Sequence, residues 1–171
     1  MIDKLKYITE RALLFPKNEP RLSFWDELHL CVTDITGTSE ADYIRAMSEH
    51  SEFCREVAKV SKFPVGRVIK DLDLIGGEGL VFGQQISSWI SPPKDPELLG
   101  DRLIIKPKGN YAVILHQGGM DTIAASHASL IKFIETNRLQ ILSPIFELDM
   151  NTYLMSKSKE DYLIHISVLV E

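Results

Sequence analysis

The sequence is short of several features that would mark a particular class of protein. It has only two cysteines in 171 residues, and Cys31 and Cys54 both lie in apolar-patterned segments, which indicates small buried side chains rather than a disulfide framework. No apolar run approaches the ~18 residues that span a bilayer, and no secretory signal is present. These absences predict a cytoplasmic protein with no membrane partner.

Motifs for catalysis and for cofactor binding are also missing. Gly76-Gly77-Glu78-Gly79 lacks the spacing and the following helix of a phosphate-binding loop, so we interpret it as a turn. The five histidines show no zinc-ligand spacing, and no nucleophile elbow occurs. The sequence therefore predicts no metal, no cofactor and no catalytic residue of a standard hydrolase or oxidoreductase.

Composition and charge are those of one globular domain. The chain is 44% hydrophobic and 25% charged, with a formal net charge of −5. This acidic balance argues against a surface that grips DNA, and no run of lysine and arginine marks a local basic patch.

Element order gives the strongest evidence for the fold. Residues 1–20 are expected to form an N-terminal helix and linker: either a helix packed on the domain or the end of a connecting helix from a larger protein. Beyond them we predict a strand at 23–35, a helix at 40–60 that begins after Gly37-Thr38-Ser39, and strands at 65–74 and 78–89 joined by a Gly76-Gly77 hairpin. After the proline-rich break at 91–96, strands at 102–107 and 110–117, a helix at 120–137 and strands at 139–154 and 162–170 repeat this order.

The predicted elements thus repeat a β-α-β-β unit twice along the chain. The pattern predicts an α+β domain over 21–171, with pseudo-twofold halves at 21–91 and 101–171. Two helices would back one antiparallel sheet, and its other side would form a central ligand pocket.

Glu147 is the most informative single residue. It lies in the strand-like run Ile145-Phe146-Glu147-Leu148, where alternation places Phe146 and Leu148 on one face and Glu147 on the other. The carboxylate is therefore either on a wet face or buried, and a buried carboxylate requires a cation or a proton.

Four segments together carry a family resemblance: 107–113 (PKGNYAV), 130–134 (LIKFI), 145–148 (IFEL) and 160–166 (EDYLIHI). In order and spacing they resemble the GyrI-like effector-binding domain (SOUL-like in fold), and specifically the drug-binding domain of MerR-family multidrug regulators. The resemblance is good over 105–170 and loose over 21–91.

The resemblance implies a set of ligand-binding residues. Glu147 would be the pocket acid that meets a cationic ligand, and Tyr162 would be the tyrosine fifteen positions beyond it. Met47, Val65 and Gly118 stand where the regulators have aromatic pocket residues, so that part of the wall has changed. Other aromatic residues are candidates for the lining: Trp25, Phe63, Phe82, Trp89, Tyr111 and Phe146.

The function implied is the binding and sensing of hydrophobic, cationic small molecules, without catalysis. The chain would be the sensor half of a bacterial transcription regulator, which meets DNA only through a module not present here, or a stand-alone binding protein; a homodimer is left open. One alternative is a hydrolase of reactive small molecules, with Glu147 as base and Tyr162 as acid. Another is a protein-interaction module that inhibits a partner enzyme.

Overall fold

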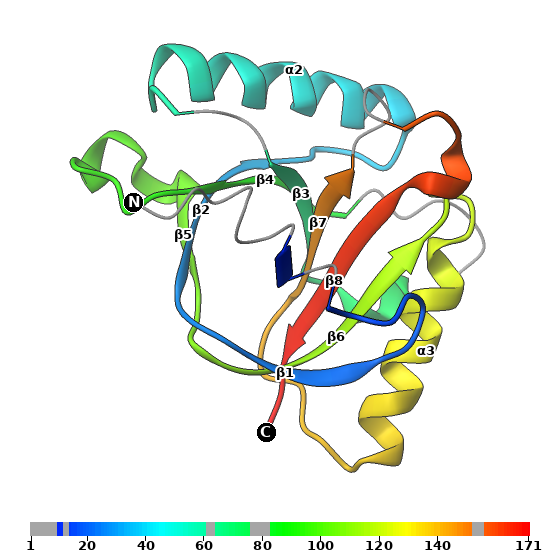
Figure 1. Cartoon of the computed structure of the whole chain (residues 1–171). Helices are drawn as coiled ribbons and strands as arrows, with labels where there is room; N and C mark the ends of the chain where they lie inside the picture. Colours follow the sequence, from blue (N-terminus) through cyan, green and yellow to red (C-terminus); the bar gives the residue numbers. More distant parts are fainter. Residues whose placement is uncertain (1–9, 12–13, 61–63, 76–82, 152–155) are drawn as a thin grey trace.

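The computed structural model describes residues 10–11, 14–60, 64–75, 83–151 and 156–171. Within these ranges the chain forms one curled, eight-stranded antiparallel sheet with two helices on its outside (Figure 1). This is the α+β architecture that the sequence predicts. None of the helices in the described ranges has the length and apolar character needed to cross a membrane.

The elements follow one another in two similar series. The first series contains β1 (Arg21–Trp25), β2 (Leu28–Asp34), α2 (Glu40–Glu56), β3 (Val65–Ile69) and β4 (Gln85–Ile90). The second contains β5 (Leu103–Lys106), β6 (Gly109–Gln117), α3 (Ile123–Thr136), β7 (Ile145–Asn151) and β8 (Leu163–Leu169). Short 3-10 turns lie at Leu72–Leu74, Pro96–Leu98, Gly100–Arg102 and Lys159–Asp161.

Strand order confirms the repeated β-α-β-β unit. The sheet runs β1-β6-β8-β7-β3-β4-β2-β5, so β2-β4-β3 of the first series mirrors β6-β8-β7 of the second. The two units meet where β3 pairs with β7. Each edge strand pairs with a strand of the other series: β1 pairs with β6, and β5 pairs with β2. One continuous sheet therefore joins both halves.

Several element boundaries differ from the prediction. The strand expected at 23–35 is two strands, because β1 leaves for the far edge of the sheet and β2 begins afresh at Leu28. The helix expected to run to 60 ends at Glu56, and the left-handed φ of 50° at Lys59 turns the chain away from it. The strand expected at 65–74 ends at Ile69, since Asp71 caps a 3-10 turn.

In the second half, the strand expected at 139–154 begins only at Ile145. The proposed Gly76-Gly77 hairpin turn and most of the N-terminal helix fall outside the described residues.

Helix α2 begins where its sequence predicts. Ser39 Oγ accepts a hydrogen bond from the Asp42 amide, and the Asp42 carboxylate accepts one from the Ser39 amide. This reciprocal capping box satisfies amides that would otherwise lack partners in the first turn. It fixes the point at which the chain leaves β2 to cover the outer face of the sheet.

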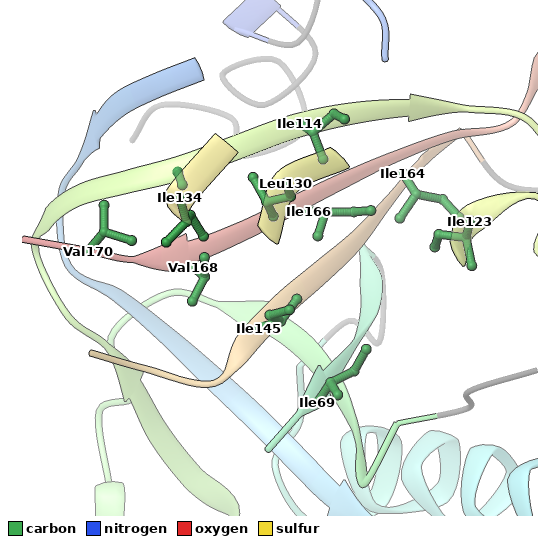
Figure 2. Packing of buried hydrophobic residues seen from close by; sticks show 11 residues of the cluster. Ile69, Ile114, Ile123, Leu130, Ile134, Ile145, Ile164, Ile166, Val168 and Val170 are labelled. Carbon is green, nitrogen blue, oxygen red and sulfur yellow. The ribbon is translucent and has the colours of Figure 1, made fainter. Parts of the chain in front are cut away.

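The outer face of the sheet packs on α3. Leu130 and Ile134 on the helix meet aliphatic side chains from neighbouring strands, all of them buried (Figure 2). The buried members of this cluster are Ile69, Ala112, Ile114, Ile123, Leu130, Ile134, Ile145, Ile164, Ile166, Val168 and Val170. Branched aliphatic residues of this kind fit a pleated surface well.

The opposite, concave face has a different character. Its buried members are Trp25, Leu30, Val32, Val68, Trp89, Tyr111, Val113, Phe146 and Leu148, which we call the concave cluster. Because side chains alternate along a strand, Phe146 and Leu148 lie on this face while their neighbour Ile145 lies under α3. The aromatic residues of the core are thus gathered on the side of the sheet opposite α2 and α3.

Candidate functional site

Four aromatic side chains from four strands form the centre of the concave cluster. The rings of Trp25 and Trp89 pack edge to face with their centroids 6.0 Å apart, a favoured geometry for aromatic pairs. Tyr111 donates its hydroxyl hydrogen to the Pro107 carbonyl at 2.6 Å, so its ring is held in place. Phe146 completes the group from β7. The four rings are buried together in the curl of the sheet.

Lys106 lies among these rings at the end of β5. Its Nζ is 3.6 Å from the ring centroid of Tyr111, 5.1 Å from that of Trp25 and 5.6 Å from that of Phe146. The side chain is 0% exposed. Burial, with a smaller contribution from the charge of Arg11, lowers the pKa of Lys106 to about 7. The amine is therefore poised between its charged and neutral forms near neutral pH.

His165 on β8 is the second buried titratable group on this face. Its ring lies 4.9 Å from Trp25 and 6.2 Å from Phe15, centroid to centroid. Burial, with help from the positive charges of Lys106 and Arg11, lowers its pKa to about 3. His165 is therefore a neutral imidazole, with one N–H donor and one acceptor nitrogen.

The start of the described chain covers the concave cluster. Figure 1 shows these first residues within the curl of the sheet. Phe15 packs against the cluster, and the Arg11 guanidinium carbon stands 3.9 Å from the ring centroid of Trp25. Arg11 also donates a hydrogen bond to Ser23 Oγ at 3.0 Å. The aromatic face is thus occupied by one ring and one cation of the protein itself.

Glu147 is buried on the opposite, helix-bearing face of the sheet. Its carboxylate forms an ion pair with Arg67 of β3 and lies 2.6 Å from His127 Nε2 of α3. Burial opposes the charge, yet Arg67 and His127 together hold the pKa of Glu147 below its usual range. A carboxylate can only accept, so His127 Nε2 carries the donated hydrogen. Of the two alternatives for this residue, burial is the one observed.

Asp149 lies two residues further along β7 on the same face. Burial raises the pKa of Asp149 to about 6, with Arg67 opposing and Glu147 reinforcing that rise. Arg67 is thus the cation that interacts with both buried carboxyl groups, those of Glu147 and Asp149. Its own burial disfavours its charge, but Glu147 and Asp149 keep its pKa raised.

The structure disperses the other predicted ligand-binding residues. Tyr111 and Phe146 share the concave cluster, whereas Met47 and Val65 pack together between α2 and the outer face of the sheet. Gly118 follows β6 with a φ of +140° and lines a surface hollow with Asp121, Thr122 and Lys159.

Tyr162 directly precedes β8, where its neighbour Leu163 pairs with Asn151. That position is four residues along β7 from Glu147, or about 13 Å. Glu147 and Tyr162 are not brought together, and their assignment to one ligand site stays a prediction. Of the other proposed lining aromatics, Trp25 and Trp89 join the concave cluster, while Phe63 and Phe82 lie outside the described residues.

Sequence reasoning missed Lys106, His165 and Arg67. A lysine after Leu103-Ile104-Ile105 is typical of an edge strand that ends in solvent, and lysine is almost never fully buried without a partner. Its place over the rings depends on the pairing of β5 with β2, in which Lys106 lies opposite Leu28, 78 positions earlier in the chain (106 − 28). Alternation in β8 could have placed His165 on the face opposite Ile164 and Ile166.

One cluster combines side chains of metal-ligand type. Possible ligand atoms of Cys31, His50 and Cys54 lie within 4.8 Å of one another, beneath α2, and all three residues are buried. His50 Nδ1 is 2.9 Å from Thr33 Oγ1, and its Nε2 is 2.8 Å from Ser88 Oγ. The part of the chain that the structure describes offers three ligands here, one short of a structural zinc site, and the imidazole has hydroxyl partners. Mutual hydrogen bonding therefore accounts for the cluster.

Comparisons with known proteins depend on structure alone. No family model matches the chain, and no curated protein matches it in sequence. A hydrolase encoded by lin2189 from Listeria innocua has 14% identity and a TM-score of 0.64, over 95% of this chain and 96% of that one. The EcmrR C-terminal domain has 13% identity and a TM-score of 0.66, over 90% and 97%.

EcmrR in complex with DNA also matches, with a TM-score of 0.67 and 12% identity, over 97% of this chain and 62% of that one. SAV2435 bound to tetraphenylphosphonium gives a TM-score of 0.55 and 16% identity, over 90% and 94%. These proteins share the order of strands and helices rather than the sequence. The chain therefore has the fold of the GyrI-like effector-binding domains.

Proposed function

We propose that this domain binds an aromatic small molecule on the concave face of its sheet. The observation that carries the proposal is the gathering of Trp25, Trp89, Tyr111 and Phe146 on the face of the sheet opposite α2 and α3. Rings of this kind supply area and stacking surface for a flat or bulky apolar ligand. Support also comes from the fold, because SAV2435 holds tetraphenylphosphonium.

The ligand would act as a signal rather than as a substrate. EcmrR, which shares this fold, forms a complex with DNA. The present chain is similar to the C-terminal domain of EcmrR. We propose that the domain here is likewise the sensing part of a bacterial transcription regulator, or else a stand-alone binding protein. DNA would be contacted through a separate module.

The role first predicted for Glu147, as receptor for a cationic ligand, stays a prediction. Its pairing with Arg67 and His127 weighs against that role, because the charge is already balanced from within the protein. The concave cluster, and not Glu147, is therefore the basis of the proposed site. If Glu147 does receive a cation, Glu147→Gln will weaken the binding of organic cations and leave the binding of neutral analogues unchanged. Calorimetric titration measures both affinities.

Tryptophan emission tests the proposed site, since both tryptophans of the chain belong to the concave cluster. N-phenyl-1-naphthylamine, a neutral aromatic probe, should accept energy from them and show saturable binding. Phe146→Leu should weaken this binding, because it removes a ring from the site. Leu22→Ala, on an exposed position of β1, should leave it unchanged. Absence of energy transfer, or equal losses in both variants, would overturn the proposal.

A second candidate is hydrolysis of an electrophilic small molecule, because the fold is shared with a Listeria hydrolase. The arrangement around Glu147 supports it less well. A general base works best with a pKa near the operating pH, and the pKa of Glu147 is held low by Arg67 and His127. Incubation with styrene oxide, followed by mass spectrometry of the diol, tests it. Turnover by the native chain that disappears in Glu147→Gln, while circular dichroism shows that this variant is still folded, would establish the enzyme.

A further inference from the structure

Lys106 is a buried cation for which the described part of the chain supplies no anion. Its pKa is affected by burial and by Arg11, both of which lower it, and by no carboxylate. Its Nζ has no hydrogen-bond partner among the described residues. The three aromatic rings around it give cation–π contacts, but these recover only part of the hydration that a buried ammonium loses.

His165 has the same deficit next to it. Neither ring nitrogen forms a hydrogen bond to another described residue, although the side chain is only 3% exposed; the ring's polar contact is with the backbone of His165 itself. A buried polar group without a partner is destabilising, because it has given up its hydrogen bonds to water. Two such groups on one aromatic face are difficult to explain as packing alone. They are the arrangement expected of a site whose missing partner is a ligand.

Positive charge is concentrated on this face of an acidic protein. Besides Lys106, Arg11 stands over Trp25, and Arg21 stands 5.3 Å from the ring centroid of Phe15. These three cations come from the N-terminal segment, β1 and β5, whereas the whole chain has a net charge of −5. Non-specific electrostatics would therefore draw a cationic ligand to the protein, while the concave face itself favours an anion.

We infer that the concave face takes an aromatic organic anion, with its rings against Trp25 and Tyr111 and its negative charge beside Lys106 and His165. This inference rests on the proposed function, which it sharpens by naming the charge of the ligand. The ligand replaces the ring of Phe15, which now covers His165 and the concave cluster. An anion supplies the counter-charge that Lys106 lacks among the described residues, whereas a cation would meet the like charge of Lys106.

Two ions of nearly identical shape and opposite charge provide the test. Tetraphenylborate and tetraphenylphosphonium each carry four phenyl groups on a central atom, so the difference in their affinities isolates the effect of charge. Calorimetric titration of the whole chain should show tetraphenylborate binding at least about tenfold more tightly. Lys106→Met should remove most of this preference. Lys108→Met, which changes an exposed lysine near Phe24, should preserve it.

The outcomes separate this inference from the proposed function. If both ions bind and the phosphonium binds as tightly or more tightly, the concave face binds ligands but the inference is wrong. If neither ion binds, and the neutral probe fails as well, the proposed function itself is wrong. A preference for the borate that survives in Lys106→Met would also overturn the inference, because the charge would then act elsewhere.

A measurement on the unaltered protein guards against misfolding of Lys106→Met. The groups that face Lys106 are Arg11, Tyr111 and His165. Burial raises the pKa of Tyr111, and His165 stays neutral above its pKa of about 3. Between about pH 6 and about pH 9, Lys106 is thus the group that titrates. Tetraphenylborate affinity should fall by about tenfold or more over that range, and a flat profile would contradict the inference.

Discussion

Arg67 and Glu147 form an ion pair across the junction between the two halves of the sheet. They stand directly opposite each other where β3 pairs with β7, and they are 4% and 1% exposed. His127 brings α3 to the same carboxylate. One carboxylate therefore links a strand from each half with a helix, which makes Glu147 an organising residue of the fold.

Glu147→Gln should destabilise the protein by roughly 3 kcal/mol or more, because it leaves the buried guanidinium of Arg67 without its counter-charge. Urea unfolding followed by circular dichroism measures the loss. Glu135→Gln, on an exposed position of α3, is the matched control and should change stability by less than about 0.5 kcal/mol. Replacing both partners, as Arg67→Met with Glu147→Leu, should recover much of the loss. Equal stability of Glu147→Gln and the native chain would refute this role.

Gly66→Ala should disrupt the same junction. A Cβ at this position would lie 1.9 Å from the backbone oxygen of Glu147, and neither backbone can move without breaking the pairing of β3 with β7. We expect a loss of at least about 3 kcal/mol or failure to fold. Gly100→Ala is the control: a Cβ there has open space, and the left-handed φ of +51° costs about 1 kcal/mol. Comparable losses in thermal unfolding of the two variants would show that the junction tolerates separation.

Stability should rise with pH above neutrality because of Lys106. Its pKa is about 7 in the folded protein, against an ordinary 10.5 in the unfolded chain. Between these values the unfolded chain binds more protons, so the free energy of unfolding increases with pH. The penalty for burying the charge is complete below about pH 7 and is relieved above it. Lys106→Met should therefore be more stable than the native chain at about pH 6, by on the order of 2 kcal/mol.

That advantage should shrink as the pH is raised towards about 9.5. Chemical unfolding of both proteins over this pH range measures the difference in their free energies of unfolding. Titration of other groups contributes equally to both proteins and cancels in that difference. An advantage that does not vary with pH would mean that Lys106 keeps an ordinary pKa.

The cluster of Cys31, His50 and Cys54 should not depend on a metal. Because Thr33 and Ser88 already satisfy both nitrogens of His50, treatment with EDTA should leave the melting temperature unchanged, as should added zinc. Zinc content measured by mass spectrometry of the purified protein provides the direct check. A stoichiometric ion, or a melting temperature that falls with EDTA, would assign the cluster as a metal site.

The sequence predicts the fold better than the site, for physical reasons. Element order and the turn at Ser39 depend on local periodicity and capping, which nearby residues determine. The partners of Glu147 depend on the register between distant strands: Arg67 comes from the other half, and neither it nor His127 can be inferred from the surroundings of Glu147. Alternation alone correctly separates Glu147, the pocket acid that the resemblance implies, from Phe146, which was a further candidate for the lining of the same pocket.

The burial of Lys106 likewise could not be predicted from the neighbouring residues in the sequence. Its sequence context is that of an exposed strand end, and only the pairing of β5 with β2 brings it over the rings. A buried lysine with no hydrogen-bond partner among the described residues departs from the rule that such groups stay in solvent. Violations of this kind concentrate at functional sites, where stability is given up for binding.

A crystal structure with tetraphenylborate bound tests the central claim most directly. The account predicts the anion on the concave face, in place of the Phe15 ring, with Lys106 Nζ within about 6 Å of a phenyl centroid. Tetraphenylborate on the outer face beside Glu147, or in the surface hollow lined by Gly118, with Phe15 still over His165, would contradict it.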